Sequence, residues 1–402
     1  MKLAGGDLSR LVTMGDTLLA WEGPGFKMTA ADRTSGKVLW KFELQNAPVP
    51  EWPPATPEGV FSDLRHLEAD LRRLNHRIDA LLREKGVGPE TQAVQSQRND
   101  LRELLRQKAL GDNLYLVSGQ DLFSIDRRSG GLRWKKPLGF LPSARPVASQ
   151  DRVFVVDGSS QQVRVYSVQH QGDEMTPIPG PVVGGLAYSD PLLSFVGRDG
   201  FVHAHKGTDG TLVWKEEIKG KVTSPPAVAL ARRAAIPGRP PGTITRLLLV
   251  PAGRMLYAFD QDAGVLLWKV ECSSEITSVP IWAGDTLYLK TADQNLIALE
   301  LLPERAGQIE VAGRLRWKLP GGERILLRGR DLVYVLATEP EVIGVRALTG
   351  EPVSRFSLGS FRDVATNLED GMLYVARPGG WVEALLEIPY GVHSRWRLYG
   401  VL

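Results

Sequence analysis

The 402-residue chain lacks the features that would indicate a disulfide-bonded, nucleic-acid-binding or membrane-spanning protein. Its single cysteine, Cys272, excludes an intramolecular disulfide and any zinc or iron–sulfur site built from several cysteines. The 49 basic and 46 acidic residues give a formal net charge of only +3, so we expect no nucleic-acid partner and no polybasic membrane surface. No stretch approaches the roughly 18 apolar residues that a membrane-spanning helix needs.

The N-terminal segment also lacks the apolar run of a secretory signal, and no cysteine lies near it for lipid attachment. We therefore expect the chain as written in the cytoplasm, or in the periplasm if a leader has been trimmed from it. Sequence signatures such as a P-loop, a nucleophile elbow or a zinc-protease helix are missing as well. From the sequence we expect no catalytic residue, no metal ligand and no cofactor.

Glycine and proline, by contrast, are plentiful, and the glycines fall in a repeated pattern. There are 42 glycines and 27 prolines, about one residue in six, which is typical of a chain with many tight turns. The pattern is Asp-x-x-[Ser/Thr/Ala]-Gly-x-x-x-Trp, and it is complete at residues 32–40, 126–134 and 260–268. Residues 206–214 and 309–317 keep the spacing from glycine to tryptophan, and Trp396 follows Gly391 by five residues.

Each residue type in this pattern has a physical reason. The carboxylate can accept hydrogen bonds from N–H groups of a turn, and the glycine supplies a positive φ without steric cost. The tryptophan lies in the returning strand and can bury ~150–250 Å² against a neighbouring sheet. The predicted docking motif consists of Trp40, Trp134, Trp214, Trp268, Trp317 and Trp396, of Asp32, Asp126 and Asp260, and of Gly36, Gly130, Gly210 and Gly264.

The motif recurs with a basal period of ~40 residues, which is typical of propeller blades with four short strands. Thr176 and Ser354 occupy two positions that lack an indole. The three longer intervals contain insertions at residues 58–110, 231–242 and 301–310. The sequence therefore predicts an all-β, eight-bladed β-propeller of four-stranded blades, in which residues 1–57 and 111–402 form one domain.

The repeat resembles that of the quinoprotein-type (PQQ-like) β-propeller family, and the resemblance covers nearly the whole chain except about residues 50–110. The family includes quinone-dependent alcohol dehydrogenases and non-enzymatic scaffolds similar to BamB. In those dehydrogenases a vicinal cysteine disulfide typically covers the cofactor, and Glu, Asn and Asp hold calcium. Because Cys272 stands alone, the resemblance favours the scaffolds, with the quinone-dependent oxidoreductase as the alternative.

Residues 58–110 interrupt the β pattern with a predicted antiparallel coiled-coil hairpin. An apolar seam with alternating spacings of three and four runs along the first helix, and a turn at residues 86–89 leads to a second helix from Glu90 to about Ala109. The hairpin is expected between the first and second strands of blade 2. Either its seam only pairs its own two helices, or part of it binds a partner. The candidate partner-binding residues are Leu64, Leu67, Leu71, Leu74, Ile78 and Leu81.

Three other features are expected to be structural. His203 and His205 lie on the same face of a strand, but two imidazoles are too few ligands for a metal site. Cys272 follows a docking strand and is expected to be a small buried residue rather than a nucleophile. The arginine-rich loop could touch an acidic partner but is expected to be a solvated surface; its arginines are Arg232, Arg233 and Arg239.

Taken together, these features predict a non-catalytic scaffold. A rigid disc would present its loops and the hairpin to protein partners within a larger assembly, since binding residues on such discs usually lie in loops. Two copies could also associate through the hairpin. A ligand-sensing module is a further alternative, and the identity of the partner cannot be read from the sequence.

Overall fold

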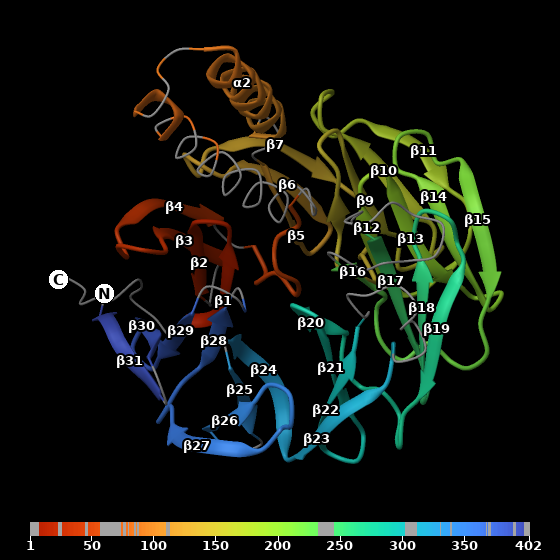
Figure 1. The fold of residues 1–402 in the computed structure, drawn as a ribbon. Helices are drawn as coiled ribbons and strands as arrows, with labels where there is room; N and C mark the ends of the chain where they lie inside the picture. Colours follow the sequence, from red (N-terminus) through yellow and green to blue (C-terminus); the bar gives the residue numbers. More distant parts are fainter. Residues whose placement is uncertain are drawn as a thin grey trace.

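The structure is a computed structural model. It describes residues 8–22, 26–44, 47–56, 74, 78, 80–83, 86, 88–109, 113–231, 245–301, 312–329, 331–337, 340–366, 368, 371–388 and 391–397, with the backbone alone at 9, 100–109, 231, 387–388 and 391–397. The strands form a ring of eight antiparallel sheets, which confirms the predicted eight-bladed, all-β propeller (Figure 1).

The strands of each blade follow one another in the chain, from the hub of the ring to its rim (Figure 1). Blade 1 contains β1 (Leu8–Met14), β2 (Thr17–Glu22), β3 (Phe26–Asp32) and β4 (Val38–Leu44). Blade 3 contains β8 (Val147–Ala148), β9 (Arg152–Val156), β10 (Val163–Ser167) and β11 (Glu174–Ile178). Blade 4 contains β12 (Val182–Ser189), β13 (Leu192–Gly197), β14 (Phe201–Lys206) and β15 (Leu212–Glu217).

The remaining four-stranded blades have the same order. Blade 5 contains β16 (Ala227–Ala231), β17 (Thr245–Ala252), β18 (Met255–Asp260) and β19 (Leu266–Glu271). Blade 6 contains β20 (Ile281–Ala283), β21 (Thr286–Thr291), β22 (Asn295–Glu300) and β23 (Leu315–Pro320). Blade 7 contains β24 (Gly322–Arg328), β25 (Leu332–Ala337), β26 (Glu341–Arg346) and β27 (Pro352–Ser357), and blade 8 contains β28 (Asp363–Thr366), β29 (Met372–Arg377), β30 (Trp381–Ile388) and β31 (Gly391–Arg397).

Blade 2 is the exception, because its sheet has three strands: β5 (Asn113–Ser118), β6 (Asp121–Asp126) and β7 (Leu132–Pro137). Ala55 takes the innermost position, where it exchanges two backbone hydrogen bonds of 2.7 and 2.8 Å with Tyr115. The chain between Ala55 and β5 is the inserted segment. The insertion therefore lies between the first and second strand positions of this blade.

One helix of the insertion is described along its whole length, α2 (Pro89–Ala109), which lies beyond the ring next to blade 2 (Figure 1). Its start follows from local chemistry: proline suits the first helical position, and Thr91 Oγ1 donates a 2.9 Å hydrogen bond to the carbonyl oxygen of Gly86, whose φ is +68°. Before this turn, Leu74, Ile78 and residues 80–83 are also helical. The described residues do not establish a coiled-coil hairpin.

The ring closes by packing between blades 1 and 8. Leu11 N donates a 2.8 Å hydrogen bond to Asp363 Oδ2, and Thr13 Oγ1 donates one of 2.8 Å to the carbonyl oxygen of Thr366. A shared apolar cluster lies beside these bonds and contains Leu8, Leu11, Leu18, Ala20, Ala365, Met372, Tyr374, Ala376, Val382 and Ala384. Because each blade is built from its own stretch of chain, this junction is held by side chains and not by a strand shared between blades.

Candidate functional site

Strand connectivity gives the disc two different faces. In every blade the first strand turns into the second, and the third into the fourth, at one face; we call it the insertion face. The second and third strands meet at the other face, which also carries the connections from one blade to the next; we call it the crossover face. This follows because all of the neighbouring strands within a blade are antiparallel.

All three long insertions join strand ends at the insertion face. The segment between Ala55 and β5 links the first and second strands of blade 2, and residues 232–244 link the same two strands of blade 5. Residues 302–311 lie between the third and fourth strands of blade 6. Arg232, Arg233 and Arg239 lie outside the described residues.

The predicted tryptophans pack across the blade boundaries. Trp40 of blade 1 contacts Gly130 of blade 2 so closely that a Cβ there would lie 2.6 Å from the indole, and Trp40 Nε1 donates a 2.6 Å hydrogen bond to the carbonyl oxygen of Arg127. The corresponding contacts join Trp134 to Gly172, Trp214 to Gly264, Trp268 to Gly313, and Trp317 to Gly350. Each indole thus fixes one blade against the turn of the next.

In six blades, a small residue on the third strand pairs with the docking tryptophan on the fourth strand. The sequence alone did not reveal this pattern. The pairs are Ala30 with Trp40, Ser124 with Trp134, Ala204 with Trp214, Ala258 with Trp268, Ala298 with Trp317, and Ala384 with Trp396. A register shift follows directly after every pair, typical of a β-bulge. The side chain of Trp396 lies outside the described residues, so only its backbone position is known.

The motif aspartates accept hydrogen bonds from groups of their own turns. Asp32 Oδ1 accepts hydrogen bonds from Ser35 Oγ at 2.6 Å and Ser35 N at 2.7 Å, and these bonds lower the pKa of the carboxyl group. Asp260 Oδ1 accepts from the backbone N of Asp262 and of Ala263, at 3.0 and 3.2 Å. Among the motif glycines, Gly36 and Gly210 both have a φ of +75°, as a turn of this type requires.

Asp126 is also paired with a cation. Burial opposes ionisation of this carboxyl group, but the ion pair with Arg133 and the backbone hydrogen bonds from Ser129 and Arg128 outweigh it and lower its pKa to about 2. The motif aspartates therefore hold turns together, and the lowered pKa values of Asp32 and Asp126 are the opposite of the raised value expected of a general acid.

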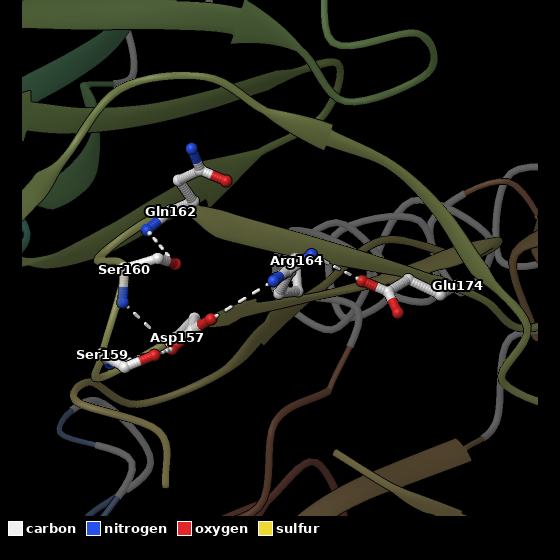
Figure 2. Close-up of polar contacts among 6 residues, drawn as sticks. All are labelled: Asp157, Ser159, Ser160, Gln162, Arg164 and Glu174. Atoms are coloured by element: carbon white, nitrogen blue, oxygen red, sulfur yellow. Dashed lines mark hydrogen bonds and ion pairs between the residues drawn. The ribbon is translucent and has the colours of Figure 1, made fainter. Parts of the chain in front are cut away.

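A further aspartate turn lies in blade 3, on the crossover face (Figure 2). Asp157 Oδ1 accepts hydrogen bonds from Ser159 Oγ at 2.6 Å, from Ser159 N at 2.8 Å and from Ser160 N at 3.3 Å. Arg164 bridges this turn to the outer strand, with its guanidinium 3.4 Å from Asp157 Oδ2 and 3.0 Å from Glu174 Oε1. Burial opposes ionisation of Asp157, and the serine hydrogen bonds outweigh it and lower its pKa far below the usual value. The Asp-Gly-Ser-Ser composition was the signal for this turn.

His203 and His205 form a parallel stack with Phe195 and do not converge on a shared site. The ring centroids of the histidines lie 5.3 and 5.4 Å from that of Phe195. Asp199 lies 3.1 Å from His203 Nε2 and 2.7 Å from Lys215 Nζ. His205 is 3% exposed, and burial lowers its pKa.

Cys272 is buried, and burial raises the pKa of its thiol to about 11, so the thiol stays protonated at neutral pH. Within the described part of the chain, no group of three or more His, Cys, Asp or Glu side chains could hold a metal ion. No helix in that part is long and apolar enough to cross a membrane.

The candidate partner-binding residues are only partly visible. Ile78 and Leu81 are buried against Val94 of α2, and Leu74 packs against the same cluster. Leu64, Leu67 and Leu71 lie outside the described residues. Where the insertion is described, its apolar seam therefore contacts the insertion itself.

Both the sequence and the fold of the chain are similar to those of known proteins. The family model described as outer membrane protein assembly factor BamB matches residues 25–175 and 164–301. No curated protein sequence matches the chain.

Among solved structures, BamB from Moraxella catarrhalis is similar with a TM-score of 0.59 and 14% identity, over 94% of this chain and 96% of that one. A europium-containing methanol dehydrogenase has a TM-score of 0.58 and 12% identity, over 92% and 83%. The computationally designed Ika8 protein has a TM-score of 0.57 and 11% identity, over 96% and 98%. At such identities the likeness shows a shared fold, whatever each protein does.

Proposed function

The chain belongs to the family of the outer membrane protein assembly factor BamB, since the matched residues span more than half of it, and from this premise we propose that it is a non-catalytic scaffold whose insertion face binds protein partners. The observation that carries the proposal is the placement of all three long insertions at that face. Long loops on a rigid disc are where binding residues usually lie.

The rim of the disc is a poor alternative for docking, because the outermost strands are protected against pairing with another strand. A lysine follows the docking tryptophan in five of them; we call these the edge lysines: Lys41, Lys135, Lys215, Lys269 and Lys318. Three of the five form ion pairs within their own blade, with Asp121 at 2.8 Å, Asp199 at 2.7 Å and Asp293 at 3.1 Å. Lysine on an edge strand opposes edge-to-edge pairing.

Two blades without a docking tryptophan are protected in other ways. The outer strand of blade 3 contains Pro177, which has no N–H to donate, and that of blade 7 contains Arg355, whose side chain is 58% exposed. A partner that added a strand to the rim would meet one of these obstacles in seven blades. This supports recognition through a face.

We propose further that residues 58–110 form an antiparallel coiled-coil hairpin that serves as the docking arm. The support is the cluster of Leu74, Ile78 and Leu81 with Val94, which joins the chain before the turn to α2. Because these four residues already contact one another, they are not available to a partner. The arm would instead bind a partner, or a second copy of the chain, through two surfaces: its outer polar surface near the turn, and the rest of the apolar seam at Leu64, Leu67 and Leu71.

The experiment is affinity capture from an extract of the native host with three proteins. These are the full chain, a variant in which a short Gly-Ser linker replaces residues 58–110, and a control with Lys219→Ala and Lys221→Ala on the crossover face, both of which are exposed residues. We expect the full chain and the control to capture the same proteins and the linker variant to lose them while keeping its circular dichroism and melting temperature. Equal capture by all three would contradict the docking role.

The quinone-dependent oxidoreductase is the second candidate, and the similarity to a methanol dehydrogenase is the observation that favours it. Pyrroloquinoline quinone with calcium is added to the chain, and absorbance and thermal stability are followed. The scaffold proposal expects no change in either, whereas a saturable shift would favour the enzyme. The cytoplasmic location stays a prediction, and fractionation of host cells tests it against the periplasm.

A further inference from the structure

Exposed aliphatic side chains are concentrated along the outer edge of the insertion face. In four consecutive blades they lie where the third strand turns into the fourth, and they are 42% to 72% exposed. We call these residues the aliphatic row: Leu212 and Val213 of blade 4, Val265 and Leu266 of blade 5, Leu315 of blade 6, and Leu348 of blade 7. They are six of the twelve large apolar side chains that are exposed in the described part of the chain. Such a concentration is typical of a binding surface, whereas single exposed apolar residues are ordinary.

The docking contacts join these residues from one blade to the next. Val213 directly precedes Trp214, whose indole would lie 2.7 Å from a Cβ on Gly264, and Val265 directly follows that glycine. The equivalent contacts at the next two blade boundaries lie within two residues of the row: Trp268 with Gly313, and Trp317 with Gly350. The aliphatic row is therefore continuous from blade 4 to blade 7.

Packing within the disc does not account for the row. In blade 5 the docking indole of Trp268 is 7% exposed and fills the blade boundary, while Val265 and Leu266 of the same turn are 56% and 42% exposed. Burial of these side chains under a partner would be favourable, because it removes their apolar surface from water.

Most charges beside the row are neutralised within the disc. The ion pairs are Arg246 with Asp262 at 3.4 Å, Arg316 with Asp285 at 2.7 Å, and Arg346 with Glu351 at 3.1 Å. In the turn of blade 4, the Asp209 carboxylate accepts a 2.8 Å hydrogen bond from Thr211 N, and the positive charge of Lys206 offsets it and helps to lower its pKa. These groups therefore leave little net charge for a partner to match.

Two cations beside the row remain unbalanced. Lys269 directly follows Trp268, and Arg314 directly precedes Leu315. Both are exposed, and neither forms an ion pair within the described part of the chain. The surface thus combines exposed aliphatic groups with two available positive charges.

We propose that the aliphatic row binds a protein segment that carries both aliphatic and acidic side chains, with its aliphatic groups on Leu266 and Leu315 and its carboxylates paired with Lys269 and Arg314. The inference rests on the proposed function, because it specifies the chemistry of a partner at the insertion face. Complementary charge and apolar burial together fix such a segment in one position.

Two other occupants fit less well. A second copy of the chain would oppose the row with charges of the same sign if it bound through its own insertion face. A flat lipid bilayer would have to accommodate residues 232–244 and 302–311, which begin and end at this face. A narrow protein segment can lie beside them.

The test is fluorescence anisotropy of the full chain with three labelled helical peptides of equal length. One has leucine and glutamate on opposite faces, the second has lysine in place of glutamate, and the third has serine in place of leucine. We expect the leucine–glutamate peptide to bind roughly tenfold or more tightly than either of the others, since each of them lacks one of the two complementary features. Equal affinity for all three peptides, or no saturable binding of the first, would overturn the proposal.

A pair of variants tests the aliphatic part. Leu266→Ser combined with Leu315→Ser should weaken binding of the leucine–glutamate peptide roughly tenfold or more at an unchanged circular dichroism spectrum. The matched control combines Leu141→Ser with Val279→Ser, which changes two exposed aliphatic residues on the crossover face and should leave the affinity unchanged. Undiminished binding by the first variant would refute the assignment.

A second pair tests the charges. Lys269→Glu combined with Arg314→Glu should reverse the preference, so that the leucine–lysine peptide binds more tightly than the leucine–glutamate peptide. Lys219→Glu combined with Lys221→Glu, at exposed positions of the crossover face, should keep the original preference. A preference that stays the same in both variants would show that the two cations of the row do not select the partner.

Two further measurements separate this inference from its alternatives. Sedimentation of the full chain with phosphatidylglycerol vesicles that is lost in the Leu266→Ser and Leu315→Ser variant, without peptide binding, would assign the row to a lipid surface and overturn the proposal. Capture from the host extract distinguishes the row from the arm. If the linker variant loses the captured proteins and the serine variant keeps them, the row proposal fails and the scaffold proposal stands; if neither variant loses them, both fail.

Discussion

The hydroxyl group of Tyr374 in blade 8 donates a hydrogen bond of 3.1 Å to the carbonyl oxygen of Arg33 in blade 1. Arg33 directly follows the motif aspartate, and at the same position in other blades the carbonyl oxygen accepts from a tryptophan. Trp40 donates to Arg127, Trp214 to Gln261, and Trp317 to Ala347. The equivalent carbonyl oxygen of the turn therefore accepts a hydrogen bond at several blade boundaries. At the junction between blades 8 and 1, the donor is a tyrosine from the second strand of blade 8.

Tyr374→Phe should destabilise the ring at its closing junction. Tyr374 is 1% exposed and its ring stays in place, so we expect the loss of the hydrogen bond to Arg33 to lower the free energy of unfolding by about 1 kcal/mol. Urea denaturation followed by circular dichroism measures it. Tyr257→Phe provides a comparison away from the junction of blades 8 and 1, since the Tyr257 hydroxyl group donates a hydrogen bond of 3.0 Å to the carbonyl oxygen of Lys219. An unchanged denaturation midpoint for Tyr374→Phe would show that the junction does not depend on this bond.

Trp317→Phe and Trp268→Phe should differ although both remove a buried indole. Trp317 Nε1 donates to the carbonyl oxygen of Ala347 at 2.9 Å, whereas Trp268 Nε1 has no acceptor among the described residues. We expect Trp317→Phe to cost about 1 kcal/mol more in unfolding free energy, because only this change breaks a hydrogen bond. Equal losses in urea denaturation would contradict the role of the carbonyl acceptor.

Gly130→Ala should destabilise the protein more than Gly253→Ala. Both glycines have a positive φ, +71° and +62°, so both substitutions cost about 1 kcal/mol in backbone strain. At Gly130 a Cβ would also lie 2.6 Å from the ring of Trp40, whereas at Gly253 nothing lies within 4 Å. The excess loss at Gly130, measured as the difference between the two melting temperatures, reports the indole contact. A difference of zero would mean that the indole moves away freely.

The stability of the protein should fall as the pH is lowered from 7 to 5, in part because of His205. Burial lowers the pKa of this imidazole below its ordinary value of 6.5, so the unfolded chain takes up the proton first. The stabilisation from neutral His205 is then complete above pH 6.5 and is lost progressively as the pH falls from 6.5 through the lowered pKa of the folded state. His205→Phe should flatten this part of the curve of unfolding free energy against pH. An unchanged slope of that curve in His205→Phe would contradict this role of the buried imidazole.

Blade number and most docking contacts could be predicted because they depend on local signals that repeat. In five blades a glycine with positive φ is followed four residues later by a tryptophan that packs against the next blade. Blade 3 departs from this spacing. The residue that faces its neighbour's Gly210 is Ile178, not Thr176, and Gly172 N bonds to an oxygen five residues back instead of four. One extra residue in a turn shifts the contact, and no spacing rule detects it.

The hub could not be predicted in the same way. Arg145, Tyr188, Val228 and Trp282 come from four blades and share no motif, so only the closed ring brings them to one cavity. The small residues opposite the tryptophans were also missed. Alanine and serine carry no special chemistry, and their position on the third strand matters only once its pairing with the fourth is known.

The edge lysines have a consequence for handling and for chemical modification of the protein. Each ammonium group places a positive charge on an outermost strand, where such a charge opposes pairing with the strand edge of another molecule. Acetylation would neutralise that charge without changing the strand, and the discs would then be able to join rim to rim. Protection of the rim at five of the eight blades therefore depends on the charge state of these lysine side chains.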